Sequence, residues 1–540
     1  MPDERIYDVI VVGGGHNGLT CAAYLARAGL SVLVLERRDV LGGAAVTEEP
    51  WPGYHVSSAS YVVSLMPKRI VDELSLKRYG YRVSLISPDY FVPFPDGSSI
   101  TFWGDMERDQ AEIAKFSKKD AEAFAGFDEY LERIGHLLHD LQFVIPPNLR
   151  LQDLPKWGSL AGRFRNWTGR DIAEVIRLFT ISASDLLDTW FEDDRVKGAL
   201  ATQCVIGSWN GPMSPGSAYV LLHHWVGEVD GQAGAWGWVY GGMGALSWSI
   251  AQSAKASGAR IRTDAPVKRI IVAGGRATGV ELENGEGIRA RRVVSNAHPV
   301  LTYLDMVGEE HLPAQVVGDI KRYRTRSGSV KVNLGLSKLP LPSAMGEDAG
   351  NVHKGLMAIS PSIEYLEKAW DDAKYGGMSK HPYVEAVFPT AHESEIAPKG
   401  KHIALAFCQF AAYDLKRGKW EKEREKFGKR VIETIGEYCP GFEDTVEHIE
   451  VLGPRDLEEQ FGLVGGSIFH GELAPDQLFM LRPIPGYADY RTPVAGLYLC
   501  GSGTHPGGGV MSVPGYNASR VVLRDFKRGQ LVDKVLDFGR

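Results

Sequence analysis

The sequence predicts an α/β fold in which a Rossmann-type dinucleotide-binding domain carries an inserted α+β substrate domain. Three features of the 540-residue chain lead to this prediction. An apolar run over residues 6–12 leads directly into a glycine-rich loop and a helical stretch. A second apolar run over residues 31–35 ends on Glu36 and completes a β-α-β unit. The run 496–500 leads into another glycine loop and a final helix over residues 517–526.

The first glycine-rich loop has the spacing Gly13-x-Gly15-x-x-Gly18. In such a motif the first glycine permits a tight turn, the second lets the backbone approach a diphosphate, and the third lets the helix pack on the strand. The helix that starts here directs its positive end at the phosphates. Glu36 stands where a carboxylate accepts hydrogen bonds from ribose hydroxyls, and its charge disfavours the 2′-phosphate of NADP.

A second loop of small residues, 42–46, follows six residues after Glu36. It allows another close approach of backbone to ligand, along a diphosphate or a ribityl chain. An NAD domain does not need this second loop, so the pattern favours a flavin dinucleotide. Arg37 lies between the two loops, and the sequence leaves its role open between a solvated surface charge and a contact with phosphate or ribose.

The rest of the chain alternates between segments with two different sequence patterns. Segments 1–84, 227–305 and 456–540 contain short apolar strands and glycine loops, and they predict one discontinuous dinucleotide-binding domain. Segments 85–226 and 306–455 predict the substrate domain. The individual elements expected are helices over 19–28, 120–140, 171–191 and 245–255, strands over 259–262, 267–272, 279–282 and 292–295, and a hairpin turn at Asn284-Gly285.

Composition and charge exclude several classes of protein. The formal net charge is −7, so there is no basic excess and nucleic acid is not an expected partner. The five cysteines form no CxxC pair, which argues against a disulfide framework, a metal site and a dithiol centre. The polar start is short and no apolar run reaches the roughly 18 residues of a membrane span. These features predict a cytoplasmic protein whose membrane contact, if any, is peripheral; a protein partner stays open.

The sequence resembles the phytoene-desaturase-like FAD flavoproteins. The resemblance lies in residues 42–49, in Ser57-Ser58-Ala59-Ser60-Tyr61, and in the segments 476–483 and 497–509. The nearest branch is the one that holds pyridine nucleotide-disulfide oxidoreductase domain-containing protein 2 and the desaturase-like bacterial β-carotene ketolases. The likeness runs through nearly the whole chain and is most specific at its two ends.

This resemblance implies one FAD, bound non-covalently in a glutathione-reductase/amine-oxidase-like FAD-binding domain. It implies the following contacts, with Arg37 as a further cofactor-binding candidate: Gly13, Gly15 and Gly18 at the diphosphate; Glu36 at the adenosine ribose; Gly42, Gly43 and Ala44 along the phosphate and ribityl segment; Val267 at the adenine; and Gly501, Gly509, Val510 and Met511 around the ribityl chain and flavin ring.

The activity implied is that of an FAD-dependent oxidoreductase that transfers hydride between an apolar, isoprenoid-type substrate and flavin N5. A carotenoid ketolase or isomerase and a flavin-binding regulatory protein with little turnover stay as alternatives, and no catalytic residue is assigned. Amine oxidases place an arginine directly after the Gly-Gly pair, whereas this chain has Ala44. A dithiol reductase would need a CxxC pair and a second nucleotide fold, and neither is visible in the sequence.

Two further groups of side chains have open roles. His223 and His224 follow an apolar run and are expected to pack in the core or in a pocket wall, and His505 is expected to hydrogen-bond to the backbone. Five tryptophans between residues 209 and 248 would either line a cavity for a flat or polyene substrate or fill the core.

Overall fold

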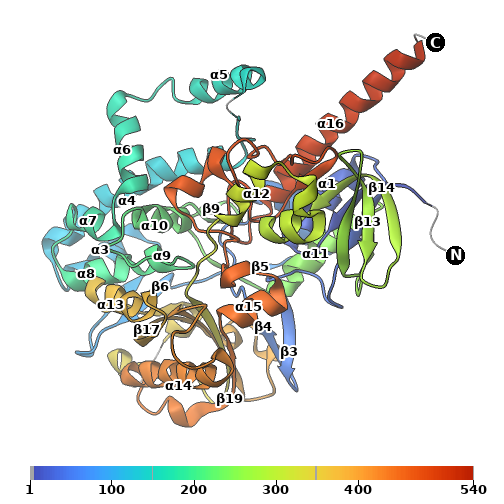
Figure 1. Ribbon diagram of the computed structural model, residues 1–540. Coiled ribbons are helices and arrows are strands. Elements are labelled where there is room, and N and C mark those ends of the chain that lie inside the picture. The colour runs from blue at the N-terminus through green and yellow to red at the C-terminus, as the bar shows by residue number, and fades with distance from the viewer. Residues whose placement is uncertain (1–4, 149, 347–349, 539–540) are drawn as a thin grey trace.

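The computed structural model describes residues 5–148, 150–346 and 350–538. Figure 1 shows two large sheets, one at the right of the view and one at the bottom, with helices packed around and between them. Each sheet has seven strands. The first has the order β11-β2-β1-β14-β13-β12, with β20 also paired to β14, and the second has the order β19-β15-β18-β17-β16-β6-β7.

The first sheet is a parallel core extended by an antiparallel meander. Its strands are β1 (Tyr7–Val12), β2 (Val32–Leu35), β11 (Arg260–Arg262), β12 (Val267–Ala273), β13 (Arg276–Leu282), β14 (Gly287–Ser295) and β20 (Leu497–Leu499). The pairs β1–β2, β1–β14, β2–β11 and β14–β20 are parallel, whereas β12, β13 and the start of β14 pair antiparallel. The long strand β14 therefore joins the two parts, and the predicted turn at Asn284-Gly285 connects β13 to it.

Helices cover the parallel core. They are α1 (His16–Arg27), α11 (Met243–Ala256) and α16 (Val513–Phe538), which pack together over the sheet. The residues of β1 are almost entirely buried, as expected for a parallel strand with helices above it. At the start of α1, a Cβ on Gly18 would lie 2.2 Å from the carbonyl oxygen of Gly13, so only glycine allows this helix to pack so close to the loop. Gly29, with φ +87°, follows the end of the helix.

The second sheet is mixed and fully buried in its centre. Its strands are β6 (Tyr90–Pro93), β7 (Ser99–Phe102), β15 (Ser329–Leu336), β16 (Leu356–Ile359), β17 (Met378–Val387), β18 (His402–Ala411) and β19 (Val446–Leu452). Alternate residues of β15, such as Val332 and Leu334, pack with Phe427 of α14 (Trp420–Tyr438) on one face. Because side chains alternate along a strand, Lys331 and Asn333 point to the opposite face.

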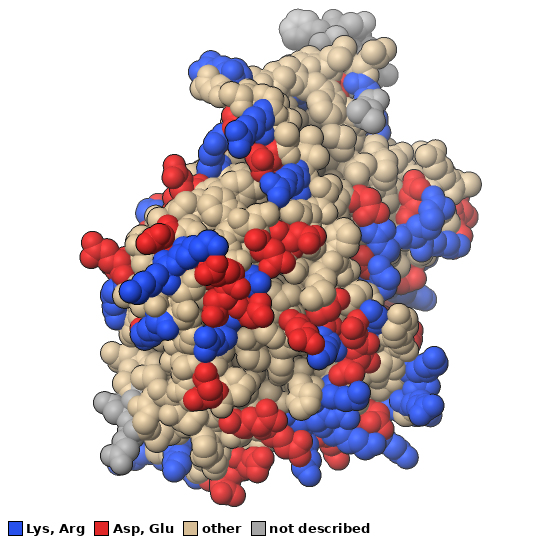
Figure 2. Space-filling view, turned by 90° about the vertical axis from the view of Figure 1, so that its left-hand side faces the viewer, with Lys and Arg blue, Asp and Glu red and all other residues tan. Residues whose placement is uncertain are grey.

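Charged residues of both signs are interspersed over the face shown in Figure 2. Among the described residues, no helix is long and apolar enough to cross a membrane.

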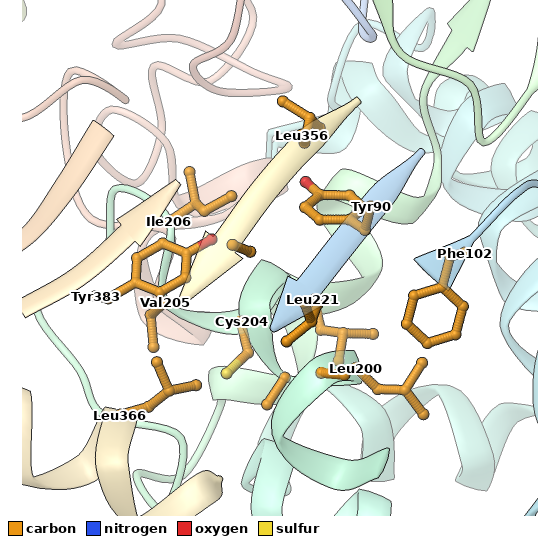
Figure 3. Close-up of a cluster of buried hydrophobic side chains, with 14 of the residues drawn as sticks. Tyr90, Phe102, Leu200, Cys204, Val205, Ile206, Leu221, Leu356, Leu366 and Tyr383 are labelled. Carbon is orange, nitrogen blue, oxygen red and sulfur yellow. The ribbon is translucent and has the colours of Figure 1, made fainter. Parts of the chain in front are cut away.

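Helices between residues 106 and 225, apart from the projecting α5, form a layer against the second sheet. The helices of this segment are α3 (Met106–Ala114), α4 (Lys118–Gln142), α5 (Leu154–Arg163), α6 (Gly169–Thr180), α7 (Ala183–Asp188), α8 (Asp194–Leu200), α9 (Thr202–Val205) and α10 (Ser217–Trp225). Figure 3 shows part of the core that joins them to the sheet: Cys204 and Val205 of α9 and Leu221 of α10 lie near Tyr90 of β6 and Tyr383 of β17.

The helix expected over 120–140 is confirmed within α4, but the single helix expected over 171–191 is wrong. The chain turns extended at Ile181, and the hydroxyl of Ser182 accepts the backbone N–H of Asp185, so a new helix, α7, starts there. The amphipathic spacing continues through this break, which is why periodicity alone does not reveal it.

The strands of the first sheet all fall in 1–84, 227–305 and 456–540, and those of the second all fall in 85–226 and 306–455. The assignment of one part to the cofactor and the other to the substrate stays a prediction.

Candidate active site

A cavity of about 390 Å³ runs from the loops of the first sheet to the buried face of the second. It collects residues from segments far apart in the sequence. Ten of the residues expected to bind a cofactor line it: Gly13, Gly15, Glu36, Arg37, Gly42, Gly43, Ala44, Val267, Gly509 and Val510.

Three expected contacts, Gly18, Gly501 and Met511, are not in the cavity wall. Gly18 serves the packing of α1 on the preceding loop. A Cβ on Gly501 would lie 2.6 Å from the carbonyl oxygen of Asn296, so this glycine permits contact between two loops. Met511 is 2% exposed and belongs to the core of the first sheet. These three residues shape the wall from behind.

The cavity end near Gly15 is built from backbone. A Cβ on Gly15 would lie 2.8 Å from Nδ2 of Asn296, and a Cβ on Gly42 would lie 2.2 Å from the carbonyl oxygen of Ala45. In the described structure, α1 has no side-chain cap and no acidic residue in its first turn. Its N-terminal N–H groups are therefore available to an anionic group such as a diphosphate.

Glu36 stands at the end of β2 with its carboxylate fixed by backbone. Its Oε2 accepts the N–H of Gly14 at 2.6 Å and its Oε1 accepts the N–H of Arg38 at 3.0 Å. The guanidinium of Arg37 donates to the carbonyl oxygens of Glu459 and Gln460 at 3.0 and 2.8 Å. Arg37 thus lines the cavity, while its guanidinium donates hydrogen bonds to backbone carbonyl oxygens.

The other end of the cavity carries a buried amine. Lys331 is 2% exposed, its Nζ donates to Oδ1 of Asn333 at 2.8 Å, and it lies 4.9 Å from the ring centroid of Tyr61. Burial lowers the pKa of Lys331 to about 7, although Glu450 and Glu385 oppose this shift. Near neutral pH this amine is therefore a group that can take up or release a proton.

A carboxylate with three tyrosine donors lies behind this wall. Tyr61 donates its hydroxyl to Oε1 of Glu385, and Tyr90 and Tyr383 donate theirs to Oε2, both at 3.0 Å. Burial raises the pKa of the Glu385 carboxyl, and the hydroxyl donors oppose the rise. Tyr61 lines the cavity, so its hydroxyl connects the cavity wall to this buried carboxylate.

Histidines form the middle of the wall. His16, His298 and His470 line the cavity; His298 is fully buried and the other two are half-buried, and burial lowers the pKa of His16 to about 4 and of His470 to about 3. They are therefore neutral at neutral pH. His470 has the left-handed φ of +54°, an uncommon backbone for a residue with a side chain.

The histidines and tryptophans with open roles fall into two groups, those that pack in the core or contact backbone and those that line the cavity. His223 contacts the carbonyl oxygen of Gly508 at 3.2 Å through Nε2, and His505 contacts that of Leu141 at 2.9 Å, which confirms the expected packing and backbone contacts. His224 lies in the cavity wall. Among the tryptophans, Trp236 lines the cavity, Trp238 is buried in the core and Trp248 is 55% exposed.

Comparison with known proteins decides the family. Residues 18–332 match the model of the flavin containing amine oxidoreductases. The rat pyridine nucleotide-disulfide oxidoreductase domain-containing protein 2 is 40% identical, over 96% of this chain and 94% of its own. The chain belongs to the flavin-containing amine oxidoreductase family. It is an FAD-dependent oxidoreductase, as the resemblance to desaturase-like flavoproteins predicts.

More distant relatives of the family align over nearly their full length. A limonene dehydrogenase polypeptide of Castellaniella defragrans is 28% identical, over 97% of this chain and 96% of its own. The lycopene-forming phytoene desaturase of Pantoea ananas is 23% identical, over 94% and 96%. A solved structure of an oxidoreductase from Methanosarcina mazei has a TM-score of 0.60 at 17% identity, over 96% of this chain and 99% of its own, and confirms the α/β FAD-binding fold.

The residues present fit the FAD of this family. A glycine cradle faces an uncapped helix N-terminus, and a carboxylate stands at the end of β2. The sequence indicated the glycine loops and, as one of two open roles, tryptophans in the cavity wall, but it did not indicate several other residues that line the cavity. Asn296, His298, Lys331, Phe407 and His470 also line the cavity, and their sequence surroundings carry no motif that marks them.

Proposed function

We propose that this oxidoreductase dehydrogenates an apolar, isoprenoid-type substrate in the cavity. The observation that carries the proposal is the continuity of one cavity from the glycine loops to an apolar chamber. The chamber is lined by Ile206, Trp236, Phe407, Ile468 and Phe469. Such a wall suits a hydrocarbon and excludes water. The names of two relatives, a limonene dehydrogenase and a phytoene desaturase, support the substrate class.

For the cofactor, we propose the part of the arrangement implied by the resemblance whose residues line the cavity. Gly13 and Gly15 hold the diphosphate, and Glu36 accepts hydrogen bonds from the adenosine ribose. The remaining contacts are Gly42, Gly43 and Ala44 along the ribityl segment, Val267 at the adenine, and Gly509 and Val510 at the flavin. When bound, FAD supplies the redox chemistry by accepting a hydride from a substrate carbon.

Removal of a hydride and a proton from neighbouring carbons leaves a double bond, so the proton needs an acceptor. The Nζ of Lys331 suits this role because its lowered pKa leaves a neutral amine available near pH 7. The Tyr61 hydroxyl, held by Glu385, orients the wall beside that amine. Apolar side chains of the chamber orient the substrate and keep water away.

An anaerobic photometric screen tests the proposal. The purified FAD protein is mixed with a monoterpene, a carotenoid precursor, quinols, amines or NAD(P)H, and the visible flavin absorbance is followed. Bleaching by an isoprenoid, with none by amines, is expected. Reduction only by amines or NAD(P)H would refute the substrate class, and a flavin that no donor reduces would favour the regulatory alternative.

A further inference from the structure

The helix α5 is unusual because it lies on the outside of the molecule with none of its residues buried. Figure 1 shows it projecting from the top of the helical layer. Residues of its apolar side recur at helical spacing, at Leu154, Trp157, Leu160 and Phe164. An amphipathic helix normally covers a core with such a side, so this one has an apolar side with no core beneath it.

Two leucines at the start of this helix are the most exposed part of it. Leu151, in the short 3₁₀ turn that precedes α5, is 86% exposed, and Leu154 is 62% exposed. Trp157 is half-buried and its indole N–H donates to the carbonyl oxygen of Asn148 at 3.2 Å. Two leucines at a protruding tip, with a tryptophan behind them, match a segment that enters the interfacial zone of a bilayer.

The segment that contains α5 and the start of α6 is basic, although the chain as a whole has a net charge of −7. Residues 150–177 contain six basic and three acidic residues. The acidic ones are occupied: Asp153 pairs with Lys156, Asp171 with Arg133, and Glu174 with Arg177. No described residue forms an ion pair with Arg165 or Arg170.

We propose that α5 and the residues flanking it form a surface that docks on an anionic membrane through Leu151, Leu154 and Trp157 at its start and Arg165 and Arg170 beyond its end. The leucines enter the headgroup and acyl boundary, and the arginines contact lipid phosphates. A membrane suits this surface better than a protein, because the apolar residues stand on a convex projection and would need a matching groove in a protein partner. The proposal does not depend on the identity of the substrate.

Vesicle flotation of the FAD-loaded protein tests this docking. The wild type is expected to float with vesicles of phosphatidylcholine mixed with phosphatidylglycerol, and to bind vesicles of phosphatidylcholine alone much more weakly. Binding is expected to fall as salt is raised, because surface attraction is screened. The double variant Leu151→Glu/Leu154→Glu is expected to lose about tenfold or more in partition coefficient. Replacement of Arg165 and Arg170 by glutamine is expected to lose about fivefold for each charge.

Leu341→Glu is the matched control, since Leu341 is 41% exposed and lies outside this surface. It is expected to float like the wild type, and all variants should keep their flavin absorbance and melting temperature. The proposal is overturned if the wild type binds neither kind of vesicle, or if the double leucine variant binds as well as the wild type. It is equally overturned if the leucines instead hold two copies of the chain together without lipid.

Discussion

The two ends of the cavity are built in different ways. At the glycine end, the wall around Gly13, Gly15 and Gly42 consists of backbone atoms, because these residues have no side chains. At the lysine end, buried polar side chains form it, and Tyr61 meets Glu385 across 324 residues of sequence. The first end is specified locally by a short motif, whereas the second exists only after two sheets have folded together. Substitutions at the two ends should therefore fail in different ways.

The largest effect on FAD binding is expected for Gly15→Val. Its Cβ would lie 2.8 Å from Nδ2 of Asn296 and its branches would fill the space in front of the N-terminus of α1. The FAD dissociation constant is expected to rise by about 100-fold or more, equivalent to about 3 kcal/mol. Fluorescence titration of the apoprotein with FAD measures this. Gly287→Val is the control, because no atom lies within 4 Å of a Cβ placed there; if both variants bind FAD like the wild type, the glycine end has been misassigned.

Lys331→Met is expected to keep FAD and lose turnover, by about 10²- to 10⁴-fold if the amine accepts the proton. In the wild type, kcat/KM should fall as the pH drops below about 7, because the protonated amine cannot accept a proton. The variant should lose this acid limb. A pH profile with an identified substrate checks both points, and an unchanged acid limb in Lys331→Met would contradict the role of the amine.

Lys331→Met, which is expected to lower activity, should raise the free energy of unfolding at neutral pH. The pKa of Lys331 is lower in the folded chain than in the unfolded chain, so the unfolded chain binds more protons between the two values. Stability should therefore rise with pH through that window in the wild type, and less so in Lys331→Met, which is expected to be more stable at neutral pH. Urea unfolding at pH 7 and pH 9 measures the change in unfolding free energy with pH. An equal change in the two proteins would show that the pKa of the Lys331 amine is not lowered in the folded chain.

Glu385→Gln is expected to destabilise the fold by about 2 kcal/mol, because a buried acceptor of three hydroxyls becomes a poorer one. The loss is measured by urea unfolding of the FAD-loaded protein. Flavin binding should change little, since this carboxylate lies at the lysine end. If Glu385→Gln lost FAD without losing stability, the lysine end of the cavity would also contribute to FAD binding, which contradicts the separation of the two ends.

The smallest effect is expected for Tyr61→Phe, which removes one hydroxyl and keeps the ring beside Lys331. A threefold to tenfold decrease in kcat/KM, roughly 1 kcal/mol, is expected with unchanged FAD affinity. Tyr383→Phe removes a hydroxyl from the same carboxylate outside the cavity wall and serves as the control. Equal losses in the two variants would assign Tyr61 a purely structural role.

Sequence reasoning reached the fold class, the family and the glycine end, because strand, loop and helix follow one another within residues 6–46. It placed Gly18, Gly501 and Met511 at the ligand; they lie outside the cavity wall, and their contact with FAD stays a prediction. It missed Lys331, which stands in an apolar strand and gains its character from burial by segments far away. It also joined α6 and α7, since the break at Ile181 depends on a cap and not on hydrophobic spacing.

One cavity is proposed to bind FAD at its glycine end and to react with substrate at its lysine end. Anaerobic stopped-flow reduction of the flavin by an isoprenoid, with FAD content measured in the same samples of wild type and Lys331→Met, tests it most directly. Equal FAD content and much slower flavin reduction are expected in the variant. Loss of FAD from Lys331→Met, or reduction at the wild-type rate, would contradict this proposal.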